Sequence, residues 1–301
     1  MLKNKNVLVT GGAGFIGSHL VDKLVSQNNE VIVLDNLLRG NKIDIQTNKN
    51  INFINGDIRD FETVIKATKN VDIIFHLAAY LGVDDVAKNP IETMEVETIG
   101  TQNLVKASIK NSINKIIYTS TSGVYGKNEI NDAVNEDYQV APSSSYAIAK
   151  RFNEIYLKSI TSKYSIETFS LRYFNVYGPR QDNRMVVPRF FEQAINNQPI
   201  KVYGDGKQTR DFTFIDDTIN ATILISEKCK KNETFNIARG FDTSMNQLAQ
   251  SIIKITNSKS EIIHIEAPFL RYDFDVEKRW GDSSKLFKFT NFRPKIDLEE
   301  G

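Results

Sequence analysis

Tyr146 and Lys150 are the residues whose types and spacing most directly suggest chemistry. Four positions apart, they share one face of a helix if the segment is helical. An ammonium group nearby can lower the pKa of a tyrosine, ordinarily about 10, by about 1–3 units. The pair therefore predicts a tyrosine that acts as a general base near neutral pH. A tyrosine and a lysine at this spacing also occur as an ordinary surface pair, so the surrounding sequence has to decide.

Hydroxyl side chains precede this pair at Thr119, Ser120, Thr121 and Ser122, directly after an apolar segment that we expect to be a strand. They could form a Ser/Thr-rich turn and nothing more. Beside a nicotinamide, however, a hydroxyl, a phenolate and an ammonium form a site that moves a hydride between an alcohol and a ketone. Lys150 could also hold the nicotinamide ribose.

A nicotinamide cofactor needs a binding site, and the first residues of the chain have the pattern of one. Apolar residues 6–9 are followed by Gly11, Gly14 and Gly17 and then by apolar residues at helical spacing. In such a strand–turn–helix unit, Gly11 permits the tight turn, Gly14 lets the backbone approach a pyrophosphate, and Gly17 lets the helix pack closely on the strand. The spacing G-x-x-G-x-x-G differs from the commoner G-x-G-x-x-G, and glycine turns also arise for steric reasons alone.

The second predicted strand, residues 30–34, ends in Asp35. An acidic residue about 20 positions after the glycines is placed to bind the adenosine ribose hydroxyls, although a solvated loop aspartate is the alternative. The order and spacing of strand, turn, helix, strand and acidic residue favour a dinucleotide-binding site over a solvated loop aspartate. Because the carboxylate of Asp35 would repel a 2′-phosphate, the sequence predicts NAD as the cofactor.

Strands alternate with helices through the first 175 residues. This alternation predicts an α/β fold, a Rossmann-type doubly wound parallel sheet with a smaller α/β substrate lobe. We expect an NAD-binding domain over residues 1–175, to which residues 211–238 return, and a smaller domain over residues 176–301. Ligands bind beyond the carboxyl ends of such strands, where the glycines, Asp35, Asp57, residues 76–79, residues 119–122 and Asn175 all fall.

The composition excludes several classes of function. A net charge of +1 with scattered Lys and Arg gives no electrostatic case for binding nucleic acid or membranes. No apolar run reaches the roughly 18 residues of a membrane span, and no signal peptide is evident. Cys229 is the single cysteine and has no ligand spacing around it, so we expect a cytoplasmic protein without a metal site.

The chain resembles the extended short-chain dehydrogenases/reductases that epimerise, dehydrate or decarboxylate nucleotide sugars. The resemblance covers nearly the whole chain. It is carried by residues 10–17, Gly56-Asp57, His76–Ala79, 120–126, Tyr146 with Lys150, 172–180, 206–212 and 294–301. Members usually continue beyond a closing Leu-Glu-Glu-Gly, where this chain ends, so we expect a shortened C-terminus.

The resemblance implies Tyr146 as the base, Lys150 as its partner and Thr121 as the hydroxyl that bonds the sugar O4. It places Asp57 and Ile58 at the adenine. It also places Asn175, Arg210 and Arg271 on the nucleotide diphosphate, since arginine suits phosphate; both arginines could otherwise be ordinary surface residues. The full predicted cofactor site is Gly11, Gly14, Phe15, Ile16, Gly17, Asp35, Asn36, Asp57, Ile58, Leu77, Ala78, Ala79, Tyr146, Lys150 and Tyr173. The full predicted substrate site is Thr121, Ser122, Asn175, Val187, Arg210 and Arg271.

The reaction that we predict is NAD-dependent epimerisation of a nucleotide sugar at C4, with a UDP-hexose or related sugar as substrate and a 4-keto intermediate. The alternatives within the family are a 4,6-dehydratase, which has an acidic pair after the threonine, and a UDP-glucuronate decarboxylase, which keeps a glutamate at the second position. This chain has Ser122 and Gly123 there. A non-catalytic NAD sensor would not need Thr121, Tyr146 and Lys150 together. The resemblance also implies a homodimer formed by the helices that follow Pro90 and begin at Tyr146.

Overall fold

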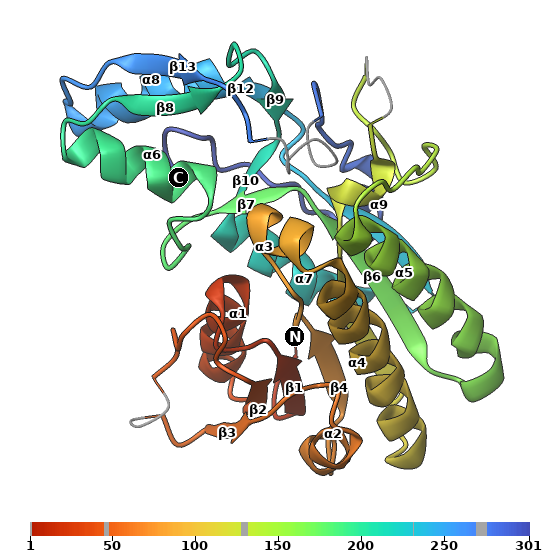
Figure 1. Cartoon of the computed structure of the whole chain (residues 1–301). Helices are drawn as coiled ribbons and strands as arrows, with labels where there is room; N and C mark the ends of the chain where they lie inside the picture. The colour runs from red at the N-terminus through yellow and green to blue at the C-terminus, as the bar shows by residue number, and fades with distance from the viewer. Residues whose placement is uncertain (1, 45–47, 128–131, 231, 269–275) are drawn as a thin grey trace.

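The computed structural model describes residues 2–44, 48–127, 132–230, 232–268 and 276–301. Its centre is a seven-stranded parallel sheet in the order β11-β6-β5-β4-β1-β2-β3 (Figure 1). The strands are β1 (Asn6–Thr10), β2 (Glu30–Asp35), β3 (Ile51–Asn55), β4 (Ile73–His76), β5 (Lys115–Thr121), β6 (Glu167–Tyr173) and β11 (Glu233–Ile237). This arrangement confirms the predicted Rossmann-type doubly wound sheet.

Helices cover both faces of this sheet, as Figure 1 shows. One face is covered by α1 (Phe15–Ser26), α7 (Ile215–Lys228) and α9 (Ser284–Thr290); the other by α2 (Phe61–Ala67), α4 (Pro90–Lys110) and α5 (Ser145–Tyr164). Side chains alternate between the two faces along a strand. In β1, Val7 and Val9 therefore pack on the first face and Leu8 on the second. All three are fully buried, as expected of a strand with both faces covered.

A second, smaller group of elements has its own apolar core, which includes Phe190, Ile200, Val202, Leu248 and Ile252. It contains α6 (Val186–Ile195), α8 (Met245–Thr256) and the parallel pair β8 (Ile200–Tyr203) and β13 (Ile262–Ile265). Two further strand pairs are β7 (Asn175–Tyr177) with β10 (Phe212–Phe214) and β9 (Thr209–Arg210) with β12 (Thr243–Ser244). Figure 1 shows α6, α8, β8 and β13 together at the end of the molecule away from β2 and β3.

The strand order reverses between β1 and β4, because the chain runs outward from β1 through β2 to β3 and then crosses to β4. Ligands of doubly wound sheets bind at this switch point, beyond the carboxyl ends of the strands. The short helices α3 (Val83–Lys88) and η1 (Ser122–Tyr125) follow β4 and β5 at this same end. Among the described helices, none is long and apolar enough to cross a bilayer.

Candidate active site

The glycine turn between β1 and α1 has no room for side chains at Gly11 and Gly17. Gly11 has φ +69°, and a Cβ there would lie 2.7 Å from the backbone nitrogen of Ala78. A Cβ on Gly17 would lie 2.2 Å from the carbonyl oxygen of Gly11. The turn therefore packs against residues 77–78 and against the first turn of α1, as the sequence predicts for Gly11 and Gly17.

Gly14 differs from Gly11 and Gly17. Within the described residues, only the Gly11 carbonyl oxygen lies inside 4 Å of a Cβ built there, at 3.4 Å. Gly14 is also the N-cap of α1, and the cap residue makes no side-chain hydrogen bond to the N–H groups that begin this helix. The first N–H groups of a helix bind anions when no side chain occupies them. The open space at Gly14 and the uncapped start of α1 at Phe15 and Ile16 fit a dinucleotide pyrophosphate.

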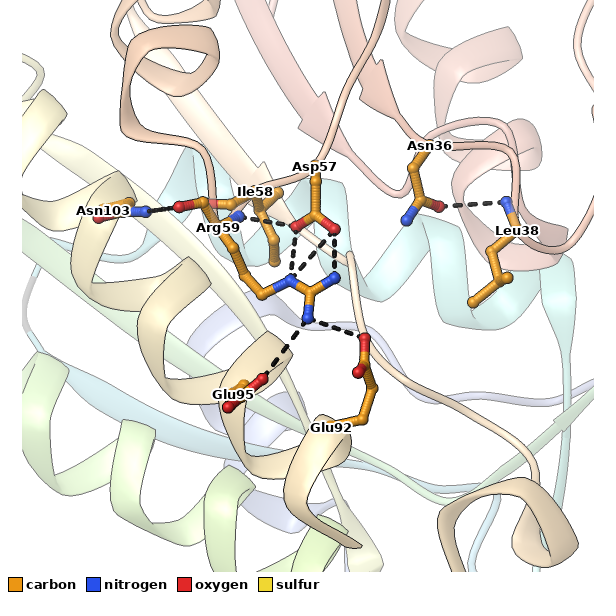
Figure 2. Close-up of polar contacts among 8 residues, drawn as sticks. All are labelled: Asn36, Leu38, Asp57, Ile58, Arg59, Glu92, Glu95 and Asn103. Carbon is orange, nitrogen blue, oxygen red and sulfur yellow. Dashed lines mark hydrogen bonds and ion pairs between the residues drawn. The ribbon is translucent and has the colours of Figure 1, made fainter. Parts of the chain in front are cut away.

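Asp35 closes β2 beside this turn. Its carboxylate accepts hydrogen bonds from the backbone N–H groups of Ala13, at 3.0 Å, and Leu37, at 2.8 Å. Burial raises the pKa of Asp35, and these two bonds oppose the shift. The next side chain, Asn36, accepts a bond from the Leu38 N–H at 3.1 Å (Figure 2). Asp35 and Asn36 thus lie at the carboxyl end of β2, which is where a group that binds the adenosine ribose is expected.

Asp57, near the start of the loop after β3, is held by Arg59. Figure 2 shows the guanidinium of Arg59 between Asp57 and two glutamates of α4. Arg59 Nη2 lies 2.7 Å from Asp57 Oδ2. Arg59 Nη1 lies 2.8 Å from Glu92 Oε1 and 3.7 Å from Glu95 Oε2. Burial alone would raise the pKa of Asp57, but the hydrogen bonds from Arg59 outweigh burial and lower it. Asp57 therefore presents an ionised acceptor.

Ile58 is fixed to α4 by backbone and side-chain contacts. The Asn103 amide donates to the carbonyl oxygens of Ile58, at 3.1 Å, and Arg59, at 2.8 Å. The Ile58 side chain packs directly over Gly100, where a Cβ would lie 2.2 Å from it. The position of this segment is consequently set by α4 as well as by β3.

The structure brings Tyr146 and Lys150 to the carboxyl end of β5. Ser144 caps α5 by accepting a bond from the Ala147 N–H at 3.2 Å, which starts the helix one residue before Tyr146. Lys150 Nζ lies 2.8 Å from the carbonyl oxygen of Thr119 and 5.5 Å from the centre of the Tyr146 ring. The helical spacing predicted for the pair is confirmed.

The four hydroxyls after β5 separate into different roles. Thr119 donates to the carbonyl of His76 at 3.1 Å, and Ser120 donates to the Glu154 carboxylate at 2.6 Å. Ser122 is buried, whereas Thr121 is partly exposed at the end of the strand and accepts a bond from the Gly123 N–H at 3.0 Å. Of the four, Thr121 is thus the one whose hydroxyl stands at the strand end without being buried.

The expected lowering of the Tyr146 pKa is not found. The pKa of Tyr146 is raised above its usual value, chiefly by burial and then by the negative charge of Glu97. Glu97 belongs to α4, and its Oε2 lies 3.1 Å from Lys150 Nζ. Lys150 is therefore already paired with a carboxylate, which offsets the effect of its charge on the phenol.

Glu97 was not singled out by the sequence analysis, although a signal exists. It recurs with Thr93, Thr101 and Ser108 at helical spacing along the buried stripe of α4. A glutamate in such a stripe needs a buried partner, because an isolated charge is costly inside a protein. The partner itself could be identified only once α4 and α5 were placed side by side.

The predicted substrate residues fall in several environments. Asn175 begins β7, and its N–H donates to the Asp211 carbonyl at 3.0 Å. Val187 is packed in the core of the smaller group of elements. Tyr173, predicted at the cofactor, is buried with its hydroxyl 2.7 Å from Thr222 Oγ1. Arg271 lies outside the described residues.

A second arginine lies close to Arg210 and was missed by the sequence analysis. Arg210 Nη1 donates to the carbonyl oxygens of Thr209 and Val276, at 2.8 and 2.6 Å. Arg279 Nη2 donates to the Gly126 carbonyl at 2.5 Å. Burial and the neighbouring charge of Arg210 lower the pKa of Arg279 to about 9. Two cations so close together favour an anion between them. In the described segments, no group of three His, Cys, Asp or Glu side chains could hold a metal ion.

Known proteins share this chain's sequence and architecture. Residues 7–238 match the model of the NAD dependent epimerase/dehydratase family. The chain is 37% identical to the UDP-glucose 4-epimerase of Thermotoga maritima, solved with UDP-glucose; the TM-score is 0.92, with 98% of this chain and 96% of that chain covered. It is 31% identical to the UDP-glucose 4-epimerase of Thermus thermophilus, solved with NAD, with a TM-score of 0.90 and coverages of 98% and 96%. It is 36% identical to the UDP-N-acetyl-alpha-D-glucosaminuronate decarboxylase of Bacillus cytotoxicus, covering 99% of this chain and 95% of that protein.

Proposed function

The chain belongs to the NAD dependent epimerase/dehydratase family, and on that premise we propose that it epimerises a nucleotide sugar at C4 through a 4-keto intermediate, with a UDP-hexose or related sugar as substrate. It is an NAD-dependent enzyme. The similarity to epimerases over nearly the whole chain supports the assignment. So do the position of Thr121 at the end of β5 and the pairing of Tyr146 with Lys150 on α5, whose ammonium reaches the carbonyl of Thr119 in β5.

In this proposal Tyr146 takes the proton of the sugar 4-hydroxyl and, once the keto group has been reduced from its other face, returns that proton to the 4-oxygen. When bound, NAD would supply reversible hydride-acceptor chemistry at C4. Thr121 holds the 4-oxygen, and Lys150 binds the nicotinamide ribose. An ammonium has three N–H donors, and the contacts of Lys150 to Thr119 and Glu97 use two of them, which leaves one for the ribose.

The remaining predicted residues enter as part of the same proposal. The dinucleotide lies along Gly14, Asp35 and Asp57, and the diphosphate of the substrate lies at Arg210. Arg279, which was not predicted from the sequence, joins Arg210 there. The NAD-binding domain comprises residues 1–175 with residues 211–238, and the substrate domain comprises the rest of residues 176–301. The parallel pairing of β11 with β6 supports the return of residues 211–238 to the larger sheet.

One observation favours epimerisation over dehydration or decarboxylation. The positions after Thr121, where the resemblance assigns acidic residues to dehydratases and decarboxylases, hold the buried hydroxyl of Ser122 and the side-chain-free Gly123. Asp85, in α3 after β4, is paired with Arg39 at 2.9 Å and with Arg184 at 3.5 Å. Without a carboxyl group at these two positions, the expected course of the 4-keto sugar is to turn over and be reduced again.

The products of a panel of nucleotide sugars test this proposal. We expect a UDP-hexose to give a product of unchanged mass with inverted C4 and no net NADH, as mass spectrometry and NMR can establish. The panel includes a UDP-hexuronate, because a decarboxylase is among the relatives. Release of carbon dioxide, or accumulation of a 4-keto-6-deoxy sugar, would contradict the epimerase assignment and require an acid or base other than Tyr146.

We further propose that the enzyme is a cytoplasmic homodimer. The support for the dimer is apolar side chains on the outer surfaces of two neighbouring helices: Ile91 and Ile99 on α4, and Ile148, Phe152 and Ile155 on α5 are each at least 41% exposed. The support for the compartment is the single cysteine, Cys229, a buried thiol that suits a reducing environment.

A further inference from the structure

We propose that Glu97 is a positioning residue that holds the ammonium of Lys150 and sets the pH range in which Tyr146 acts as the base. The inference rests on the proposed function for the role of Tyr146. It goes further in assigning to α4 a residue that controls the chemistry on α5.

The contact between the two helices is a completely buried ion pair. The side chains of Lys150 and Glu97 are 1% and 0% exposed, and Lys150 Nζ lies 3.1 Å from Glu97 Oε2. A charge at such a position persists only beside an opposite charge or strong hydrogen bonds. Each member of the pair therefore fixes where the other can lie, and the position of Lys150 beside Tyr146 depends on Glu97.

Neighbouring groups act on Glu97 from β5, from α5 and from the loop after β4. The Tyr80 N–H, in the loop after β4, and the Tyr118 hydroxyl of β5 favour the carboxylate form of Glu97 and lower its pKa. The Asn153 amide of α5 donates to the Glu97 carbonyl oxygen and to the Tyr118 hydroxyl, both at 3.0 Å. Burial raises the pKa of Glu97, and the charge of Lys150 is the strongest influence that opposes it.

No other neighbouring group takes over the role of Glu97 among the described residues. His76 of β4 lies between Thr10 and Thr101, at 2.8 and 3.0 Å, and burial with the charge of Lys150 lowers its pKa to about 3, so it is neutral. Burial also keeps Tyr118 neutral, because its pKa lies well above 10. Glu154 is paired with Arg172 at 2.9 Å and with Arg151 at 2.8 Å. The charges that face Tyr146 are therefore those of Lys150 and Glu97.

The opposing charges have opposite effects on the phenol. The Lys150 ammonium favours the phenolate of Tyr146, and the Glu97 carboxylate disfavours it. A general base works best when its pKa lies near the working pH, so an anion that limits the effect of Lys150 adjusts this pKa. Lys150 still donates to the Thr119 carbonyl when the Glu97 charge is removed, so its ammonium should then stabilise the phenolate and shift the ionisation of Tyr146 to lower pH.

The test compares Glu97→Gln, which keeps the shape and removes the charge, with Glu97→Asp, which keeps the charge and shortens the side chain. Glu30→Gln is the matched control, because Glu30 is exposed and begins β2, at the end of the strand away from Asp35. Two pH dependences are recorded for each NAD-loaded protein: kcat/KM, and the ultraviolet phenolate absorbance that Tyr146→Phe in the same background removes. We expect Glu97→Gln to move both toward lower pH by about one unit, and Glu97→Asp and Glu30→Gln to leave them near the wild-type values.

The proposal would be overturned if the Tyr146 ionisation shifted equally in Glu97→Gln and Glu97→Asp, because the shape of the side chain and not its charge would then explain the effect. It would also be overturned if the ionisation did not shift in Glu97→Gln. If Glu97→Gln does not fold, Tyr118→Phe decides: it removes a hydroxyl that favours the ionised form of Glu97, and an unchanged Tyr146 titration would count against the inference. The phenolate signal needs no substrate. A shift in absorbance without epimerase activity would therefore leave the Glu97 inference standing while refuting the proposed function.

Discussion

At the scale of single residues, Tyr146 combines two features that conflict. In the proposed mechanism it takes a proton from a sugar hydroxyl, yet its pKa is raised by burial and by Glu97. Asp57 shows the reverse balance, because its hydrogen bonds with Arg59 outweigh its burial. In both cases the ionisation of the group depends on a charged neighbour: Glu97 of α4 for Tyr146, and Arg59, two residues along the chain, for Asp57.

Tyr146→Phe tests the base at this scale. The variant retains the ring and loses the proton acceptor, so we expect the fold and bound NAD to be kept and turnover to fall about 10²–10⁴-fold. Turnover of the active UDP-hexose and the NAD content of the purified protein measure the two effects. Tyr164→Phe, at the exposed end of α5, is the matched control and should be close to wild type. Near-normal turnover of Tyr146→Phe would assign the base to another residue.

At the scale of elements, α5 has two stripes with different tasks. Lys150, Asn153 and Leu157 face inward and are buried, whereas Phe152 and Ile155 face outward and are exposed by 44% and 55%. Helical spacing separates the two stripes, so one helix can carry a catalytic pair on one side and an apolar surface on the other. Exposed isoleucines on α4 lie on the neighbouring helix, which extends this surface.

The outer stripe leads to a prediction about assembly. We expect the wild-type protein to have the mass of a dimer by light scattering at micromolar concentration. Ile155→Asp places a charge in the apolar contact and should give a monomer, because an unpaired charge is costly to bury. Ile195→Asp on α6, where the native side chain is 67% exposed, is the matched control and should remain dimeric. A monomeric wild type, or a dimeric Ile155→Asp, would contradict a contact through these helices.

At the scale of the whole molecule, the sequence predicted the sheet well because its strands are short apolar runs separated by helices with clear periodicity. The parallel strands from β1 to β6 and the helix at Tyr146 follow directly from that pattern, and the structure confirms them. The glycine turn was also predictable, since only glycine fits the contacts at Gly11 and Gly17.

Contacts between distant segments could not be predicted from the same pattern. The pairing of Glu97 with Lys150 needs α4 against α5, and the approach of Arg279 to Arg210 joins residues on either side of α8. Periodicity identifies which residues are buried but not what they are buried against. The expected direction of the Tyr146 pKa was wrong even though the Tyr146–Lys150 spacing was right, because burial raises this pKa and the charge of Glu97 raises it further.

The buried pair of Lys150 and Glu97 also has a consequence for how the chain folds. If α4 or α5 docked on the sheet without the other, it would bury one charge with no counter-ion, at a cost of about 3–5 kcal/mol. The two helices should therefore form a single cooperative unit that closes and opens as a whole. Native-state hydrogen exchange should show their most protected amides opening with one common free energy. If α4 exchanged at a clearly lower free energy than α5, an intermediate with one helix undocked would exist, and the ion pair would not couple them.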